Sequence, residues 1–184
     1  DPAAALRLLF PRETGVTYDV SDHGDRLLIR TNAADAVDFR IVETPMDAPD
    51  RDNWRDIVAH RPGCLIRSMV VFDGFLVRLE RERALPRIVI RSLVDGAEHE
   101  ISFDEEAYDL GLVPGYEYAT TTLRFSYSSP TTPQRVYDYD MATRTRTQCK
   151  EQEIPSGHDP EIYECRRVFA TSHDDVQVPV TVLR

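Results

Sequence analysis

Serine, histidine and aspartate are all present in this chain, and together they are the residue types of a hydrolytic triad. Many serine hydrolases carry the nucleophile in a G-x-S-x-G sequence, because its glycines permit the strained turn that exposes the serine. No such sequence occurs here, so any triad drawn from these residues would be arbitrary and we predict no catalytic residue. The five histidines are expected at the surface or in turns: His23, His60, His99, His158 and His173.

Two acidic segments suggest other chemistry. Asp47, Asp50 and Asp52 invite a calcium interpretation, since hard cations bind clustered carboxylates. Counted from Asp50, however, arginines occupy the positions where an EF-hand needs Gly and Glu, so we expect an ordinary turn. Glu105 and Glu106 would serve glycoside hydrolysis only as a facing pair. Adjacent residues point in different directions, which predicts a solvated loop instead.

The cysteines Cys64, Cys149 and Cys165 are odd in number, widely spaced and without a CxxC pair. This pattern is not a disulfide framework, and it favours a reducing compartment and therefore a cytoplasmic location. His60 lies four residues before Cys64, but the Pro-Gly dipeptide between them breaks the helix that would align them as metal ligands. We expect both to be structural, and we predict neither a metal nor a cofactor.

The formal net charge of −10 argues against nucleic acid or an anionic membrane as partner, because phosphate binding needs clustered Lys and Arg. No apolar run approaches the length of a membrane span. The opening DPAAALRLLF has neither the basic region nor the cleavage pattern of a signal peptide, and it lacks an initiating Met, so we expect a cut segment of a longer protein.

Two landmarks repeat along the chain. Strand-like runs that open on an arginine begin at Arg40, Arg87 and Arg135, at intervals of about 47 residues. Each follows another strand-like run, which recurs at nearly the same interval around Leu28, Leu76 and Phe125. Such a period is the mark of a repeated supersecondary unit that must stack on its neighbours.

Each repeat contains four runs with strand-like composition and turn-rich connections. The expected strands are 16–21, 26–32, 39–45 and 54–60, then 66–74, 75–82, 87–93 and 98–103, then 116–123, 124–129, 134–141 and 143–150. In the third repeat, Tyr137, Tyr139 and Met141 are expected to share one face. Phe10 and its neighbours, before Pro11, are expected to be the last strand of a preceding repeat.

These runs predict an all-β fold, namely a partial β-propeller of about three four-stranded antiparallel blades. A β-sandwich stays open as an alternative, because regularly spaced strands also suit it. Three blades cannot close a ring, so blades are missing upstream or the array ends in exposed edges. After Glu151 the repeat stops, and a turn-rich linker leads to a terminal hairpin in which Val178, Val180 and Val182 alternate with other residues.

Six segments resemble, in this order, the prolyl oligopeptidase family of serine peptidases, and within it the oligopeptidase B (protease II) branch. They are YDVSDHGDRLLIRTN (18–32), NWRDIVAHR (53–61), RERALPRIVI (81–90), ISFDEEAY (101–108), FSYSSPTTPQRVYDYDM (125–141) and VFATSHDDVQVPVTVL (168–183).

The chain departs from the family at the hairpin turn, where Asp174 and Asp175 replace the usual Asp-Gly. Asp tolerates a positive φ less well than Gly, so we expect a different or strained turn.

The resemblance implies a seven-bladed propeller that caps an α/β-hydrolase domain. Residues 1–157 would be its C-terminal blades, and 158–184 the linker and the start of the hydrolase domain, with the catalytic triad beyond Arg184. The parent would cleave short peptides after Lys or Arg, and this segment would filter substrates and be inactive alone. Its partners would be peptides, the missing hydrolase domain and blades, and possible further copies of the fragment. A non-enzymatic propeller or sandwich that binds a partner is the alternative.

Overall fold

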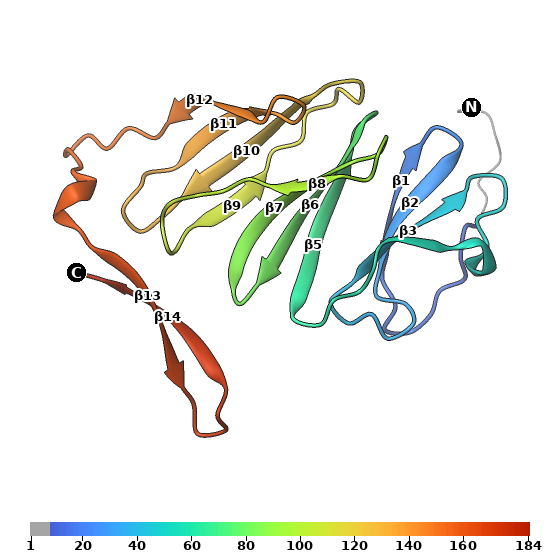
Figure 1. Cartoon of the computed structure of the whole chain (residues 1–184), viewed down its shortest axis with the longest axis horizontal. Helices are drawn as coiled ribbons and strands as arrows, with labels where there is room; N and C mark the ends of the chain where they lie inside the picture. The colour runs from blue at the N-terminus through green and yellow to red at the C-terminus, as the bar shows by residue number, and fades with distance from the viewer. Residues whose placement is uncertain (1–7) are drawn as a thin grey trace. The chain divides into compact units, whose positions relative to one another are not determined.

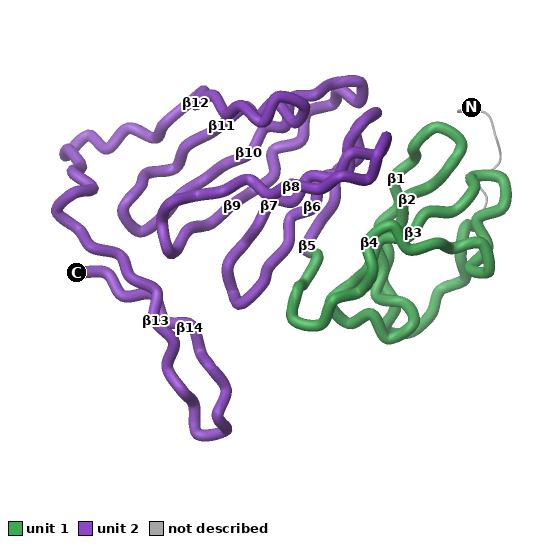
Figure 2. Tube along the Cα trace, in the orientation of Figure 1, with its two compact units in different colours: residues 1–66 green, residues 67–184 purple. Residues whose placement is uncertain are grey.

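The computed structural model describes residues 8–184, whose regular secondary structure is almost all β-strand (Figure 1). The chain divides into two compact units, residues 1–66 and 67–184 (Figure 2). The expectation about the very start of the chain falls partly on residues 1–7, outside the described part. Within the described part, no helix is long and apolar enough to cross a membrane.

The first unit contains a four-stranded antiparallel sheet in which each strand pairs with the next along the chain. Its strands are β1 (Tyr18–His23), β2 (Arg26–Thr31), β3 (Arg40–Pro45) and β4 (Arg55–Val58), and the short 3₁₀ helix η1 (Arg51–Asn53) precedes the last. All four agree with the predicted runs to within a few residues.

Phe10 belongs to the core of this sheet. Its ring lies edge-on to the rings of Tyr18 and Trp54, with 5.2 Å between centroids in each case, and its side chain is buried with Leu27 and Ile29. Residues 8–13 form no strand. The prediction that Phe10 and its neighbours form the last strand of a preceding repeat is therefore wrong for residues 8–13, because the Phe10 ring fills the first sheet's own core. The rest of that prediction lies outside the described residues.

Two further sheets have the same sequential pairing. The second contains β5 (Cys64–Val71), which crosses the boundary between the units, β6 (Phe75–Glu82), β7 (Leu85–Ser92) and β8 (Glu98–Glu100). The third contains β9 (Asp109–Leu112), β10 (Thr122–Ser128), β11 (Arg135–Asp140) and β12 (Thr145–Glu151). Three successive four-stranded meanders are the topology of propeller blades, not of a Greek-key sandwich.

The repeated landmarks occupy equivalent places in the three sheets. Leu28, Leu76 and Phe125 lie on the second strands β2, β6 and β10, and each side chain is fully buried. Arg40, Arg87 and Arg135 lie on the third strands. The predicted repeat is confirmed.

The first strand of the third sheet was predicted at 116–123, and this prediction is wrong. β9 takes that position and pairs with the second half of β10. Gly111 of β9 lies opposite Ser126, and a Cβ at Gly111 would stand only 2.7 Å from the Ser126 Oγ. The close approach of the two strands therefore favours glycine, a residue that strand-propensity reasoning counts against a strand.

One apolar core joins the second and third sheets. Buried side chains of both sheets form it, among them Val77, Leu79, Ile88, Ile90, Leu110, Leu123, Phe125, Tyr127, Tyr139 and Met141. Tyr137 packs against its margin, so the predicted shared face of Tyr137, Tyr139 and Met141 is confirmed.

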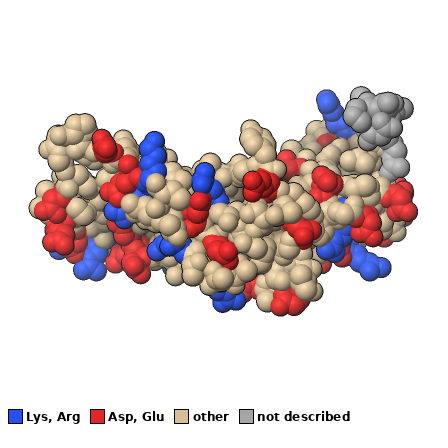
Figure 3. Space-filling view, turned by 90° about the horizontal axis from the view of Figure 1, so that it is seen from above, with Lys and Arg blue, Asp and Glu red and all other residues tan. Residues whose placement is uncertain are grey.

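The three repeated arginines each form an ion pair with a carboxylate on the fourth strand of the same sheet. Arg40 contacts Asp56 at 3.2 Å, Arg87 contacts Glu100 at 2.7 Å, and Arg135 contacts Glu151 at 2.9 Å. Cross-strand pairs of this kind contribute about 0.2–1 kcal/mol each. On the face shown in Figure 3, basic and acidic side chains are interspersed, so that face offers no broad basic field to phosphates.

The chain ends in the two-stranded sheet of β13 (Cys165–Thr171) and β14 (Gln177–Leu183), reached through the 3₁₀ helix η2 (Pro160–Ile162). The predicted terminal hairpin is confirmed. In its turn Asp175 adopts a left-handed φ of 63°. Because Asp175 has a side chain, this turn carries the backbone strain expected from the sequence.

Candidate functional site

The histidines considered for catalysis have structural contacts. His60 Nε2 accepts a hydrogen bond from the backbone N–H of Asp38 at 3.3 Å, while Cys64 Sγ accepts one from Arg61 at 2.9 Å. His60 and Cys64 thus face different partners. Burial lowers the pKa of His99, and the nearby charge of Arg144 lowers it further.

A serine, a histidine and an aspartate do stand side by side in the turn of the terminal hairpin. Ser172 Oγ lies 3.3 Å from His173 Nδ1, but it donates its proton to Asp174 at 2.6 Å. In a catalytic triad the histidine stands between the serine and the acid. Here the acid binds the serine directly, so these residues cap a turn.

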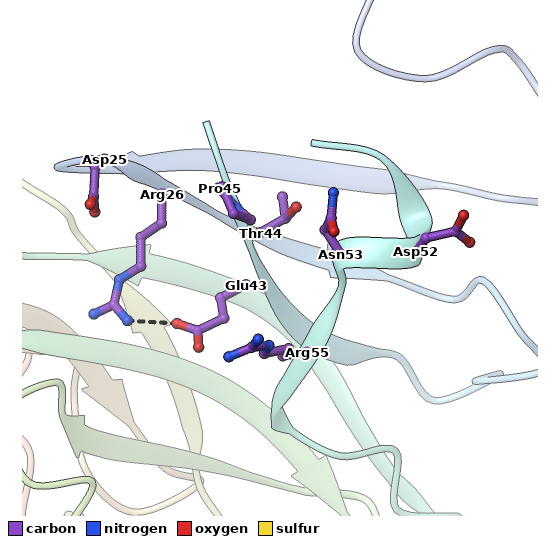
Figure 4. A pocket seen from close by; sticks show the side chains of 8 residues that line it. All are labelled: Asp25, Arg26, Glu43, Thr44, Pro45, Asp52, Asn53 and Arg55. Carbon is purple, nitrogen blue, oxygen red and sulfur yellow. Dashed lines mark hydrogen bonds and ion pairs between the residues drawn. The ribbon is translucent and has the colours of Figure 1, made fainter. Parts of the chain in front are cut away.

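The acidic loop at 47–52 forms a turn that ends in η1. No group of three His, Cys, Asp or Glu side chains among residues 8–184 could hold a metal ion. A hollow of about 320 Å³ opens beside this loop in the first unit (Figure 4). Its lining is Asp25, Arg26, Glu43, Thr44, Pro45, Asp52, Asn53 and Arg55.

Figure 4 shows charges of both signs in this hollow. The Arg26 guanidinium donates a hydrogen bond to one carboxylate oxygen of Glu43 at 2.6 Å. Arg55 is the cross-strand neighbour of Glu43. The mixed charges do not select a ligand of one sign, so the hollow defines no specific chemistry.

Four hydroxyl groups converge on Glu105. Its carboxylate accepts hydrogen bonds from Ser129 at 2.9 Å, from Thr131 and Thr132 at 2.8 Å each, and from the Tyr127 hydroxyl. Burial acts to raise the pKa of Glu105, but these hydrogen bonds outweigh it and hold the pKa below its usual value. The prediction of a solvated loop is wrong for Glu105, because this side chain organises the connection between β10 and β11.

Glu106 points to a different partner, the terminal hairpin. Its carboxylate accepts the backbone N–H of Arg167 at 2.7 Å and lies 3.6 Å from the guanidinium of Arg166. The prediction that Glu105 and Glu106 do not form a facing pair is confirmed. Burial raises the pKa of the Cys165 thiol, and the charges of both glutamates raise it further.

The linker after the third sheet is tied to the same connection. His158 Nε2 lies 2.8 Å from the carbonyl oxygen of Thr131. A carbonyl oxygen only accepts, so Nε2 must carry the proton. These contacts bring Glu105, Glu106, the β10–β11 connection and the hairpin together where the chain leaves the third sheet. We call this region the exit junction.

Arg83 and Phe169 also belong to the exit junction, although no sequence pattern singled them out. The Arg83 guanidinium lies 4.7 Å from the centroid of the Phe169 ring. The predicted runs 75–82 and 87–93 indicate a hairpin connection at 83–86. In the structure the turn is tighter, because only Arg83 and Ala84 separate β6 from β7.

The three four-stranded sheets define a fragment of a β-propeller whose exit is fixed by a carboxylate-rich junction. Comparison with known proteins agrees, since the sequence pattern of the prolyl oligopeptidase N-terminal beta-propeller domain matches residues 1–152. The chain belongs to the prolyl oligopeptidase family, and it carries part of that family's propeller domain.

Individual relatives extend the likeness over nearly the whole chain. Dipeptidyl aminopeptidase BI of Pseudoxanthomonas mexicana is 41% identical over 187 residues, which cover 99% of this chain and 25% of that protein. Oligopeptidase B structures from Trypanosoma brucei, in a closed form with covalently bound antipain, and from Leishmania major both match with a TM-score of 0.88. Their identities are 31% and 30%, and each match covers 97% of this chain and 26% of the other. The chain spans about a quarter of the length of these relatives.

Proposed function

We propose that the chain is the substrate-filtering part of a serine endopeptidase that hydrolyses short peptides after Lys or Arg. The observation that carries the proposal is the likeness to two oligopeptidase B structures over 97% of the chain. The net charge of −10 supports a preference for basic peptides. Rigid blades leave a narrow passage, which would admit flexible peptides and exclude folded proteins.

The chemistry would lie outside this chain. Residues 1–157 would form C-terminal blades, and 158–184 would begin the hydrolase domain. The nucleophile, the acid and the histidine would follow Arg184, so the 184-residue chain alone would be inactive. Its partners would be peptides, the hydrolase domain and the remaining blades. Three free cysteines, of which Cys149 is exposed, support a cytoplasmic location.

A second peptidase activity is favoured by a specific observation. The relative with 41% identity is named a dipeptidyl aminopeptidase, which releases dipeptides from a free amino terminus. The two activities differ in whether the substrate's amino terminus must be free.

The test uses the full-length parent protein and two substrates with the same leaving group. In both substrates the leaving group is attached to the carboxyl group of an Arg residue. In the first substrate the amino terminus is blocked. The second substrate is a dipeptide with Arg in the second position and a free amino terminus. Cleavage of the blocked substrate supports the endopeptidase proposal, whereas cleavage of the free dipeptide alone overturns it in favour of the second activity. The parent with its nucleophilic serine replaced by Ala is the control, and the 184-residue chain should cleave neither substrate.

A non-enzymatic binding module is the competing class. The parent gene beyond Arg184 separates the two, because a serine peptidase of this kind needs G-x-S-x-G and a downstream Asp and His. Their absence over the next few hundred codons would end the peptidase proposal.

The isolated chain should also self-associate. An open set of blades has unpaired strand edges and an uncovered blade face, which tend to pair with other chains. Light scattering across micromolar concentrations checks this, and a constant monomer mass would contradict the expectation.

A further inference from the structure

The terminal hairpin is held at one end only. Cys165 and Arg167, near the start of β13, are partly buried, whereas most of the hairpin is exposed. Val168 and Phe169 of β13 are 47% and 39% exposed, although both are apolar. An isolated two-stranded sheet is marginally stable in water, so the few contacts at its base decide where it lies.

Glu106 supplies the first of these contacts. It accepts the backbone N–H of Arg167 on the free edge of β13, and it pairs with the Arg166 guanidinium. The Arg167 N–H therefore points away from β14 and reports directly on whether the hairpin is docked.

The turn between β6 and β7 supplies the second. Its tip presents the carbonyl oxygen of Arg83 to the guanidinium of Arg167, which donates to it. The guanidinium of Arg83 lies 4.7 Å from the Phe169 ring centroid, and that of Arg167 lies 5.4 Å from the same centroid. Phe169 is thus flanked by two cations.

The backbone of this turn is left-handed at two residues that have side chains. Arg83 has a φ of 50° and Ala84 a φ of 62°, where hairpins of this type favour Asn-Gly. Strained backbone persists where the side chain is needed for a contact. Glycine at Arg83 would relieve the strain but would lose the guanidinium over Phe169.

We propose that Arg83 and Glu106 form a releasable latch that docks the β13–β14 hairpin against the second and third sheets. The latch consists of an ion pair, a charge-assisted hydrogen bond and cation–π contacts, all largely exposed, so salt screens it. Its release frees the hairpin while the apolar core of the two sheets stays intact. If residues 158–184 begin the hydrolase domain, which rests on the proposed function, the latch would also tie that domain to the blades.

Hydrogen exchange on the 184-residue chain tests the latch. The variants are Glu106→Ala, Arg83→Gly and the double variant, with Asp104→Asn as the matched control that neutralises an exposed carboxylate of the same loop. We expect the double variant to speed amide exchange at Arg167 and through β13 at least tenfold, with smaller effects of each single variant. The Asp104→Asn variant should leave β13 exchange within twofold of the unmodified chain.

Two results would overturn the latch. One is unchanged β13 exchange in the double variant, and the other is exchange at Arg167 that is already unprotected in the unmodified chain. Exchange of β10 amides serves as the folding check. Arg83→Gly keeps the test decisive if Glu106→Ala unfolds the chain, because glycine suits the left-handed turn. In that variant the β6–β7 amides should be at least as protected as before, while β13 exchanges faster.

Discussion

Strands β10 and β14 share one sequence pattern and have opposite surroundings. In β10 the alternate residues Leu123, Phe125 and Tyr127 are buried in the core of the second unit. In β14 the alternate residues Val178 and Val180 are 43% and 39% exposed. Period-two alternation therefore indicates a strand and its two faces, but it does not say whether the covering layer lies within the same chain.

The largest expected effect is a difference in the free energy of unfolding between a substitution in β10 and one in β14. Replacing Phe125 with Ala removes a fully buried ring and should lower the free energy of unfolding by about 3–5 kcal/mol. Val180→Ala, in the exposed hairpin, should change it by less than about 0.5 kcal/mol. Urea unfolding of both variants measures the contrast. Equal losses would show that the hairpin is buried in solution.

The next effect concerns the Glu105 carboxylate, which binds the connection between β10 and β11 in the exit junction. Glu105→Ala leaves the hydroxyls of Ser129, Thr131 and Thr132 without their acceptor, and it should cost about 1–2 kcal/mol because the site is partly exposed. The equivalent change in the hairpin, Asp174→Ala, removes one exposed turn contact and should cost less than about 0.5 kcal/mol.

Acid should erase the contribution of Glu105. Its pKa is lower in the folded chain than in the unfolded one, so the unfolded state takes up the proton first as pH falls. The stabilisation is therefore complete above the ordinary carboxyl pKa and declines as pH falls through the folded value. The stability difference between the unmodified chain and Glu105→Gln should shrink from about pH 7 to about pH 3. A constant difference would contradict the assignment.

An effect of similar size tests the close approach of β9 and β10. Gly111→Ala places a Cβ 2.7 Å from Ser126 Oγ and should cost about 1–2 kcal/mol. Adding Ser126→Ala removes the clashing atom and should restore most of the loss. A double-mutant cycle measured by urea unfolding gives the coupling, and strictly additive losses would argue against β9 as the partner of β10.

The smallest effect lies in the hairpin turn. Asp175→Gly removes the cost of a left-handed φ at a residue with a side chain and should stabilise the hairpin by about 0.5 kcal/mol. Because the hairpin lies outside the core, the gain should appear as slower amide exchange in β13 and β14 and not in the global unfolding midpoint. Faster exchange there would contradict this interpretation.

The strands could be predicted from the sequence wherever their own residues showed a recurring apolar pattern. The regular recurrence of Leu28, Leu76 and Phe125 reports burial at equivalent positions, so the four-stranded repeat could be predicted. β9 could not, because its fit depends on Gly111 facing Ser126 across strands that only the folded chain brings together. The exit junction was missed for a similar reason. The hydroxyls that bind Glu105 come from residues more than twenty positions away, and no local pattern encodes that convergence.

The ion pairs of the three repeated arginines have a consequence for how the number of blades can change in evolution. Each of Arg40, Arg87 and Arg135 is neutralised by an acid of its own sheet, so each blade balances these charges internally. A gene duplication or deletion that adds or removes one whole blade would then leave none of these three arginines without its acidic partner. For these arginine pairs the repeat unit carries both partners, so a change in blade number would keep each pair intact.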